Sequence, residues 1–248
     1  MQRAMPDQPP SALRERLKRL PGARRAAHWL RCLLGPEYRE IARLRRSAAG
    51  QLLQPYTQTG EDRYPAVFDM LAQHLAPIAE PRILSFGCSS GAEVRALRRW
   101  MPAAKITGLD LNRVMIARAR AADPDPRSTY VCAGAPEPGV LFDAVLAMAV
   151  FRHGDLEAAR PDSCAAVLPF SRFVDGLAML DRHLAVGGWL ALYNQQFRLS
   201  DTPLAARYAA DPLLMGEDEA LVLLYGPDNR RIDGARERLV LFRKLADS

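Results

Sequence analysis

Apolar and polar residues in the middle of the chain follow two alternating patterns. Short apolar runs of about five to seven residues predict buried strands, and amphipathic segments with a helical repeat separate them. The expected strands are residues 82–86, 105–110, 127–132, 142–148 and 187–193, and the expected helices are 92–101, 112–122 and 171–185. This alternation predicts an α/β fold in which helices cover both faces of a parallel sheet.

Two further apolar runs near the C-terminal end predict a change of strand direction. Ala220–Tyr225 and Arg238–Lys244 are separated by a connection that begins with Gly226-Pro227-Asp228-Asn229. These residue types favour turns, so we expect the two runs to pair as an antiparallel hairpin. The complete pattern predicts a Rossmann-like, mostly parallel seven-stranded sheet with a terminal antiparallel hairpin.

The N-terminal residues differ from this pattern. Residues 1–12 are rich in proline and polar types, which predicts disorder. A helical repeat runs from Leu13 to about Leu34, with a break at Pro21-Gly22, and another helix is expected from Glu37 to Leu53. The predicted domains are therefore a helical extension over residues 1–55 and an α/β domain over residues 56–248.

A polar loop and one more helix lead into the first strand. Residues 54–60 contain Pro55 and Gly60 and form the expected boundary between the two predicted domains. The helix that follows is expected from Arg63 to Leu75, with its apolar residues on one face.

The basic excess of the chain lies in the N-terminal extension. Residues 1–50 hold 12 Lys or Arg against 4 Asp or Glu, whereas the remaining residues hold 22 against 24. The extension can be a solvated cap that packs one face on the core, or a surface for anionic lipid, an acidic protein or nucleic acid. A transit peptide is disfavoured because serine is not enriched and the helical pattern is continuous. An acidic partner or a membrane surface thus remains an open interpretation.

Composition sets further limits. An apolar fraction of 49% over 248 residues is enough for one sizeable core. The sequence holds no run of about 18 apolar residues, and Met1–Asp7 lacks the apolar centre of a secretory signal. The four cysteines are widely spaced, which predicts a reduced cytoplasmic protein without a zinc site. The scarcity of lysine among the basic residues is interpreted as the coding bias of a GC-rich bacterial genome.

The residues from Arg82 to Asp110 carry the strongest chemical signal. A strand at Arg82–Phe86 is followed by the small-residue turn Gly87–Gly91, a helix, and a second strand that ends in Asp110. A glycine turn lets the backbone approach a ligand, and an acid at the tip of the next strand can accept hydrogen bonds from a ribose diol. The sequence therefore predicts a nucleoside-cofactor site, with the cofactor still to be chosen.

Two interpretations of the turn are disfavoured by the residues themselves. Gly87–Gly91 has the G-x-S-x-G form of a hydrolase elbow, with Ser89 as nucleophile. Such a nucleophile would need a histidine later in the chain. The histidines after Ser89 are His153 and His183, and no histidine follows the last expected strand. A dinucleotide-dependent dehydrogenase would need a glycine at the position of Ser89, and the terminal hairpin does not belong to its usual plan.

The third interpretation comes from a family resemblance. Ile83–Glu93 resembles the first motif of the class I S-adenosylmethionine (AdoMet)-dependent methyltransferases. Ser85 stands where that family has an acid, and Ser89 stands at the middle glycine. This variant, with a nearby glutamate, is similar to the form found in chemotaxis-receptor methyltransferases. Asp110 follows Gly91 at the distance of the family's ribose-binding acid.

Later segments extend the resemblance to about residues 60–245. Phe142–Met148 resembles the family's fourth strand, and Phe173–Leu192 resembles the helix, glycine pair and fifth strand that follow. The terminal hairpin is similar to the family's reversed last strand. Two positions depart from the pattern, because Ser85 replaces an acid that meets the methionine amino group and Cys132-Ala133-Gly134 replaces an acid that meets the adenine.

The resemblance implies AdoMet as cofactor and assigns residues to each part of it. The methionine part is expected near Gly87, Cys88, Ser89 and Gly91, and the ribose is expected near Asp110. Leu111 and Met148 are expected beside the adenine or the rim of the cofactor, and Ala133 and Gly134 are expected to contact the adenine. Arg63 is expected to bind the cofactor carboxylate or the substrate. For Leu111 and Met148, ordinary core packing is the alternative. No residues are assigned to a metal.

The acceptor is expected where the fourth and fifth strands end, because sheets of this kind bind ligands at the carboxyl ends of their strands. His153 is a candidate general base, unless it only hydrogen-bonds the backbone of its loop. Tyr193 and Asn194 are candidates for orienting a polar substrate, unless they only cap the strand. The long connection from His153 to Phe170 suits a substrate lid.

The sequence therefore predicts an AdoMet-dependent methyltransferase that acts on a small polar or hydroxylated metabolite. A methyltransferase for protein side chains is the main alternative among enzymes. A binding module that has kept the fold and lost the activity is the alternative outside that class. Specific nucleic-acid binding is not expected, because the chain lacks an Asn-Pro-Pro-Tyr motif and an aromatic-interleaved basic patch in its α/β part.

Overall fold

The protein is built on one seven-stranded sheet. The computed structural model describes residues 35–48, 50, 52–57, 60, 63–211, 222–235 and 237–247. The strands lie in the order β3-β2-β1-β4-β5-β9-β6. Their bounds are Arg82–Phe86 (β1), Lys105–Asp110 (β2), Ser128–Cys132 (β3), Phe142–Met148 (β4), Leu184–Tyr193 (β5), Tyr208–Ala210 (β6) and Leu241–Lys244 (β9).

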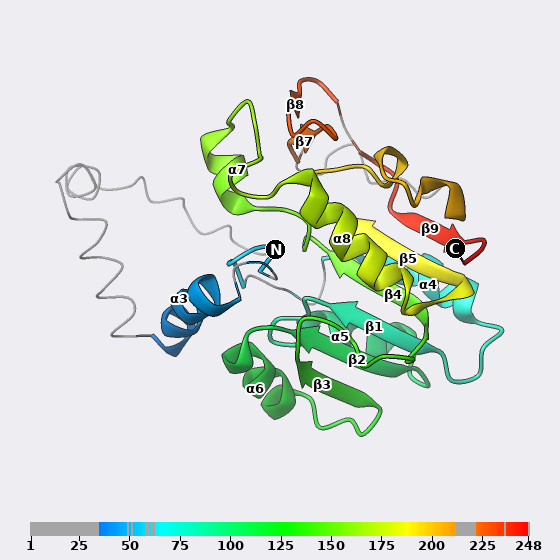
Figure 1. The fold of residues 1–248 in the computed structure, drawn as a ribbon. Coiled ribbons are helices and arrows are strands. Elements are labelled where there is room, and N and C mark those ends of the chain that lie inside the picture. Colours follow the sequence, from blue (N-terminus) through cyan, green and yellow to red (C-terminus); the bar gives the residue numbers. More distant parts are fainter. Residues whose placement is uncertain are drawn as a thin grey trace, which may run out of the picture.

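The pairing of the strands confirms the predicted fold class. Strands β1 to β5 pair in parallel, and β9 runs antiparallel to both β5 and β6. The sheet is thus Rossmann-like and mostly parallel, with an antiparallel end. The carboxyl ends of the parallel strands point toward the side on which helix α3 (Pro36–Ser47) lies (Figure 1).

The terminal strands differ from the predicted pairing of Ala220–Tyr225 with Arg238–Lys244. The partners of β9 are β5 and β6. Leu224–Tyr225 (β7) instead pairs with Arg231–Ile232 (β8) in a separate two-stranded sheet. The backbone explains the difference, because the Tyr225 amide donates to the Gln196 carbonyl, which holds β7 beside the end of β5.

Helices cover both faces of the sheet. The helices are α4 (Pro65–Leu75), α5 (Ala92–Trp100), α6 (Arg113–Ala122), α7 (Gly154–Ala159) and α8 (Phe170–Asp181), with short 3-10 turns at Leu199–Asp201 and Ala205–Arg207. Most of the predicted elements lie within a few residues of these bounds. The predicted lid between His153 and Phe170 contains α7, which sequence periodicity did not indicate because it is only 6 residues long. In the described part of the chain, every helix is too short or too polar to cross a membrane.

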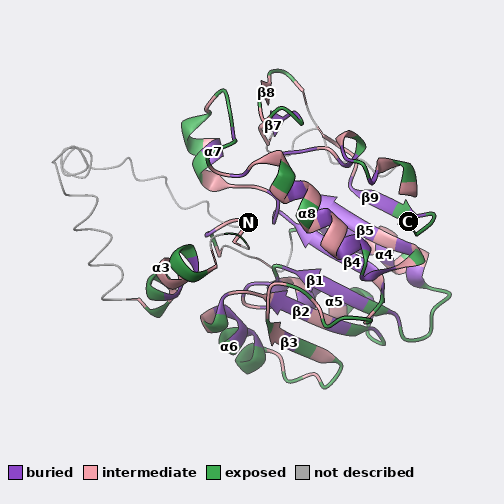
Figure 2. Cartoon of the chain, viewed as in Figure 1, coloured by how far each residue is buried: buried purple, intermediate pink, exposed green. Residues whose placement is uncertain are grey.

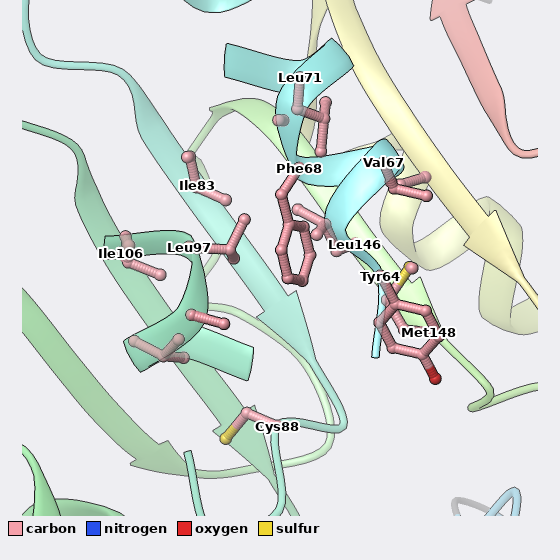
Figure 3. Close-up of a cluster of buried hydrophobic side chains, with 14 of the residues drawn as sticks. Tyr64, Val67, Phe68, Leu71, Ile83, Cys88, Leu97, Ile106, Leu146 and Met148 are labelled. Carbon is pink, nitrogen blue, oxygen red and sulfur yellow. The ribbon is translucent and has the colours of Figure 1, made fainter. Parts of the chain in front are cut away.

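One face of the sheet is closed by α4, α5 and α6. Phe68 of α4 lies between Leu97 of α5 and Leu146 of β4, and all three side chains are almost fully buried (Figure 3). At the end of the same cluster, Tyr64 lies beside Met148 (Figure 3). This packing fixes the segment before α4 against the carboxyl end of β4.

The other face is closed by α7 and α8. Phe151 contacts Phe173 of α8 edge to face at 5.0 Å, and Phe173 stacks with Phe197 at 5.3 Å. The central strands are buried on both faces, whereas the outer faces of α3 and α6 are largely exposed (Figure 2). Continuous burial of β4 explains why its sequence reads as an unbroken apolar run.

The N-terminal extension is described only from residue 35. The predicted helices between Leu13 and Leu34 and the predicted disorder of residues 1–12 lie outside the described residues. The next predicted helix is observed as α3 but ends at Ser47 instead of Leu53. Helix α3 packs beside α6, so at least this part of the extension contacts the sheet domain.

Candidate functional site

The turn after β1 is held against the tip of β2. The amides of Gly87 and Cys88 both donate to the Leu109 carbonyl, at 2.7 and 3.1 Å. Gly87 has a φ of +74°, and a Cβ at that position would lie 2.7 Å from a methyl group of Val150. Glycine is therefore required at Gly87 both by the backbone conformation and by the space available.

Asp110 ends β2 directly beside this turn. Its carboxylate accepts hydrogen bonds from the Ser89 amide at 2.9 Å and from the Asn112 amide at 2.7 Å. Burial raises the pKa of Asp110, and the two amide hydrogen bonds oppose that rise. A carboxylate offers about four lone-pair positions, so Asp110 keeps acceptor capacity for two ligand hydroxyls after these two bonds.

A pocket of about 970 Å³, including the space at its mouth, opens over the turn and Asp110. Its inner wall comes from the carboxyl ends of β1, β2 and β4, including Phe86, Leu109 and Met148. The glycine turn and Asp110 therefore face the same space.

Residues before the sheet form the opposite wall, which we call the roof. It consists of Ile41 and Leu44 of α3, residues 52–57, Gly60, Arg63 and Tyr64. The Ser89 hydroxyl donates to the Thr57 carbonyl at 2.9 Å, and the Gln54 side chain donates to the Ala149 carbonyl. The roof is thus hydrogen-bonded to the wall it faces.

Ion pairs attach α3 to α6. Glu40 is only 2% exposed, and its carboxylate lies 2.6 Å from a guanidinium nitrogen of Arg43 and 2.9 Å from one of Arg113. The hydrogen bond from Arg43 lowers the pKa of Glu40. A second, more exposed pair joins Glu37 to Arg118. These contacts hold Ile41 and Leu44 over the pocket.

The comparison with known families addresses the centre of this site. Residues 83–168 match the model of a family described as "Methyltransferase domain". This part of the chain is therefore similar to a methyltransferase domain. The matched residues include the glycine turn, Asp110 and β4, whereas α3 and the rest of the roof lie before the match.

Solved structures with related features were also found. The amino pentose methyltransferase CalS10 of Micromonospora echinaspora, solved with S-adenosylmethionine, is 24% identical over 69% of this chain and 62% of its own, with a TM-score of 0.41. The sugar N-methyltransferase KedS8 of a Streptoalloteichus species is 20% identical over 63% and 57%, with a TM-score of 0.40. The plantazolicin methyltransferase BpumL, solved with S-adenosylhomocysteine, is 16% identical over 73% and 61%, with a TM-score of 0.38.

The chain spans about three fifths of the length of these solved proteins. No curated protein matches the chain.

The structure brings most of the predicted cofactor residues together. The residues that line the pocket are Arg63, Gly87, Cys88, Ser89, Asp110, Leu111, Ala133, Gly134 and Met148. Gly91 lies just outside and begins α5 with a φ of +77°, where a Cβ would be 2.8 Å from the Tyr130 ring. Gly91 therefore shapes the start of the helix and the packing behind the turn.

The predicted acceptor residues lie next to the pocket, and none of them lines it. His153 accepts a hydrogen bond from the Asp155 amide through Nδ1 at 3.2 Å and begins α7. Burial lowers the pKa of His153, and its ring contacts the ring of Tyr56, a roof residue. Tyr193 is buried and packs on Tyr64, with 4.6 Å between the ring centroids.

Asn194 follows β5 in a left-handed conformation with a φ of +53°. Its Oδ1 is buried and accepts no hydrogen bond from any described residue. Ala149 after β4 and Ser89 after β1 are also left-handed, with φ values of +58° and +50°. Left-handed non-glycine residues are uncommon, and three of the five in the described part of the chain lie where strands β1, β4 and β5 reach the candidate site.

The contacts of Ser89 do not match those of a hydrolase nucleophile. Its hydroxyl donates to the Thr57 carbonyl, while His183 pairs through Nδ1 with the Val140 carbonyl near the start of β4. His183 therefore lies at the other end of the sheet from Ser89.

Several pocket residues were not predicted from the sequence. Glu93 lines the inner end of the pocket, and Ile41, Leu44, Leu53 and Tyr56 line the roof. The motif that contains Glu93 was recognised, but only the fold shows that its side chain enters the pocket. The roof residues have no local signal, because they reach the site through the packing of α3. Among the described residues, no cluster of three or more His, Cys, Asp or Glu is suited to hold a metal ion.

Proposed function

We propose that the protein transfers a methyl group from AdoMet to a small polar or hydroxylated metabolite. The observation that carries this proposal is Asp110, whose buried carboxylate is oriented by the Ser89 and Asn112 amides at the wall of the pocket. An acid held in this way beside a glycine turn fits the two hydroxyls of a ribose.

The residues of the pocket suit the other parts of AdoMet. The backbone of Gly87, Cys88 and Ser89 borders the space for the methionine part, with Gly91 behind it. Leu111, Ala133, Gly134 and Met148 offer an apolar edge for the adenine. Arg63 supplies a positive charge for the carboxylate.

When bound, AdoMet supplies a methyl group that is already activated by the positive sulfur. The chain then has three tasks, which are to hold the acceptor in line with the methyl group, to exclude water and to remove a proton where the acceptor carries one. The roof excludes water, because it covers the pocket with Ile41, Leu44, Leu53 and Tyr56. His153, Tyr193 and Asn194 lie next to the pocket, and we assign Tyr193 and Asn194 to orienting the acceptor. His153, whose ring contacts Tyr56, is the candidate base.

A small acceptor is favoured over a protein side chain for a geometric reason. The roof is hydrogen-bonded to the opposite wall at Thr57 and Gln54. A pocket covered on one side by such a roof admits a small molecule more readily than a folded protein surface. A cytoplasmic location and contact of the basic N-terminal residues with an acidic partner or a membrane surface remain parts of this proposal.

The test is calorimetric titration with AdoMet and with S-adenosylhomocysteine, followed by Asp110→Ala. Each hydrogen bond to a charged group is worth about 1.5–3 kcal/mol, so losing two of them should weaken binding by at least about 100-fold. The matched control is Asp69→Asn, which removes an exposed carboxylate on α4 and should leave Kd unchanged.

Each outcome decides one alternative. Absence of binding for both ligands, or an unchanged Kd in Asp110→Ala, contradicts the proposal. Binding of AdoMet without methyl transfer to any of a panel of amines, alcohols and sugars supports the alternative that the protein is a binding module that has lost its activity. Transfer to protein acceptors alone supports the protein side-chain methyltransferase.

A further inference from the structure

Tyr56 places a phenol in the roof of the pocket. Its side chain lines the pocket and is about half exposed. Two residues before it, the Gln54 side chain donates to the Ala149 carbonyl after β4. One residue after it, the Thr57 carbonyl accepts a hydrogen bond from the Ser89 hydroxyl in the turn after β1. The backbone at Tyr56 is therefore anchored on both sides to the wall that it faces.

The Tyr56 hydroxyl is paired with a carboxylate outside the pocket. It donates to Oδ1 of Asp155 at 2.5 Å. Asp155 lies in the first turn of α7, and its side chain is more than half exposed. A hydroxyl that donates its proton to a carboxylate keeps lone pairs with which to accept. The Tyr56 oxygen can thus accept a hydrogen bond from a molecule in the pocket while Asp155 holds its proton.

The start of α7 is shaped to receive the Tyr56 ring. A Cβ at Gly154 would lie 2.6 Å from Cε2 of Tyr56, so only a glycine leaves room for the ring as it is placed. The His153 ring meets it edge to face, with 6.1 Å between the centroids. Helices α3 and α7 lie at the same end of the sheet (Figure 1), and Tyr56 connects the roof to α7.

His153 is less well placed to receive a proton from the pocket. It lies outside the residues that line the pocket, and its Nδ1 accepts a hydrogen bond from the Asp155 amide. Tyr56 lies between the His153 ring and the pocket contents, because it contacts the first and lines the second. A proton that leaves an acceptor in the pocket therefore meets Tyr56 before it meets His153.

We propose that Tyr56 is a catalytic residue that takes the proton of the acceptor's O–H or N–H group and passes its own proton to Asp155. As the acceptor oxygen or nitrogen bonds to the methyl carbon, the C–S bond breaks and its electron pair stays on sulfur. The acceptor proton moves to the Tyr56 oxygen, the Tyr56 proton moves to Asp155, and the exposed Asp155 releases it to water. The inference rests on the proposed function and deepens it, because it names the path of the acceptor's proton.

Charged groups from several elements face this pair. The hydrogen bond to Asp155 raises the pKa of Tyr56, so the phenol keeps its proton at neutral pH until the acceptor supplies another. Arg45 of α3 opposes that rise. Burial lowers the pKa of His153, and Arg45 and Arg172 of α8 lower it further. The pair thus starts from a neutral phenol beside a carboxylate, with two guanidinium groups nearby.

The first measurement tests the pair in solution, without any acceptor. Nuclear magnetic resonance of the full chain with isotope-labelled tyrosine follows the ionisation of each phenol, and Tyr56→Phe identifies the Tyr56 signal by its loss. Because the bond to Asp155 raises the pKa of Tyr56, Asp155→Asn should move the titration of this signal to lower pH. An unchanged titration contradicts the inference.

The second measurement uses any member of the panel of amines, alcohols and sugars that the wild-type protein methylates. Tyr56→Phe and Asp155→Asn should each lower kcat about 100-fold, and the AdoMet Kd should stay within about twofold of wild type. The double variant should lose little more than either single variant, because both residues act on one proton. A thiol analogue of an alcohol acceptor should be affected less than about tenfold, because a thiol ionises more readily.

Three further variants separate this role from a structural one. Gly154→Ala displaces the exposed Tyr56 ring and keeps both reacting groups, so kcat should fall while the midpoint of thermal unfolding changes little. His153→Asn keeps a residue suited to begin α7 and should lower kcat less than about tenfold. The control is Tyr38→Phe, which removes an exposed hydroxyl from α3 and should retain the wild-type kcat.

The outcomes distinguish this inference from the proposed function. If methyl transfer occurs and Tyr56→Phe retains kcat, or if His153→Asn costs as much as Tyr56→Phe, the inference is wrong and the proposed function is unaffected. If no member of the panel is methylated, the proposed function fails and the inference fails with it. Should Tyr56→Phe not fold, judged by circular dichroism, the kcat of Gly154→Ala decides the question.

Discussion

Individual residues at this site work through backbone geometry as much as through side-chain chemistry. Ser89 uses its amide to orient Asp110 and its hydroxyl to hold Thr57 of the roof. A glycine at this position, as in the usual form of the motif, would keep the first bond and lose the second. The serine in the turn therefore joins the roof to the cofactor wall.

Glu93 should also make the stability of the ligand-free protein depend on pH. Its folded-state pKa of about 7 lies above the ordinary value of 4.5, so folding favours the protonated form. The stability that Glu93 contributes is fully present below about pH 4.5 and is lost as the pH rises through 7.

Glu93→Gln should therefore be more stable than wild type at pH 8, by up to about 3 kcal/mol, and close to it at pH 4.5. Urea unfolding at the two pH values measures the difference. A gap of equal size at both would show that Glu93 does not titrate in this range.

At the scale of elements, a glycine sets how closely α5, β3 and α6 pack. A Cβ at Gly91 would lie 2.8 Å from the Tyr130 ring of β3 and 3.0 Å from Ala119 of α6. Gly139 has a similar φ of +80° and nothing within 4 Å. The two positions thus share the backbone strain and differ only in the space around them.

Gly91→Ala should cost the strain of a left-handed alanine plus the overlap with Tyr130, about 2–4 kcal/mol in total. Gly139→Ala should cost only the strain, about 1–2 kcal/mol. Chemical denaturation of the two variants gives the comparison. Equal losses would mean that Tyr130 moves aside without cost.

The sequence predicted the elements whose own residues define them and missed those that depend on distant partners. Strands β1, β2 and β4 are apolar runs of 5 to 7 residues and were placed correctly. Strand β6 has only 3 residues and takes its place from pairing with β9, so no local pattern indicated it.

The same distinction applies to the site. The spacing of Gly87, Gly91 and Asp110 reflects one strand-turn-helix-strand unit, which can be recognised in the sequence. Ile41 reaches the pocket because α3 is held by Glu40 and Arg113, across about 70 residues of intervening chain. A contact of that kind is set by tertiary packing and leaves no pattern in the sequence.

At the scale of the whole molecule, the two ends of the sheet have different roles. The carboxyl ends of the parallel strands carry the pocket, whereas a buried ionic network ties the opposite end together. Asp181 accepts hydrogen bonds from Arg207 at 2.8 Å and from Tyr208 at 2.7 Å. The Lys244 ammonium, 1% exposed, donates to the carbonyls of Asp181 and Leu184. The network joins α8, β5, β6 and β9.

Asp181→Asn should destabilise the fold by about 3–5 kcal/mol, because it removes the charge of a buried carboxylate that pairs with Arg207 and lies 3.5 Å from the Lys244 ammonium. Its control is Asp247→Asn, which removes the exposed partner of the same lysine and should cost less than about 1 kcal/mol. Denaturation curves measure both, and AdoMet affinity should be unchanged in each. Similar losses in the two variants would show that the buried network adds no more than a surface pair.

The position of α3 also has a consequence for rates. Because Ile41 and Leu44 cover one side of the pocket, we expect movement of this helix to affect how fast a bound molecule exchanges with solvent. The ion pairs of Glu40 then govern residence time as well as affinity. We expect departure of the spent cofactor to limit turnover, and salt, which weakens the more exposed pair of Glu37 and Arg118, to speed it.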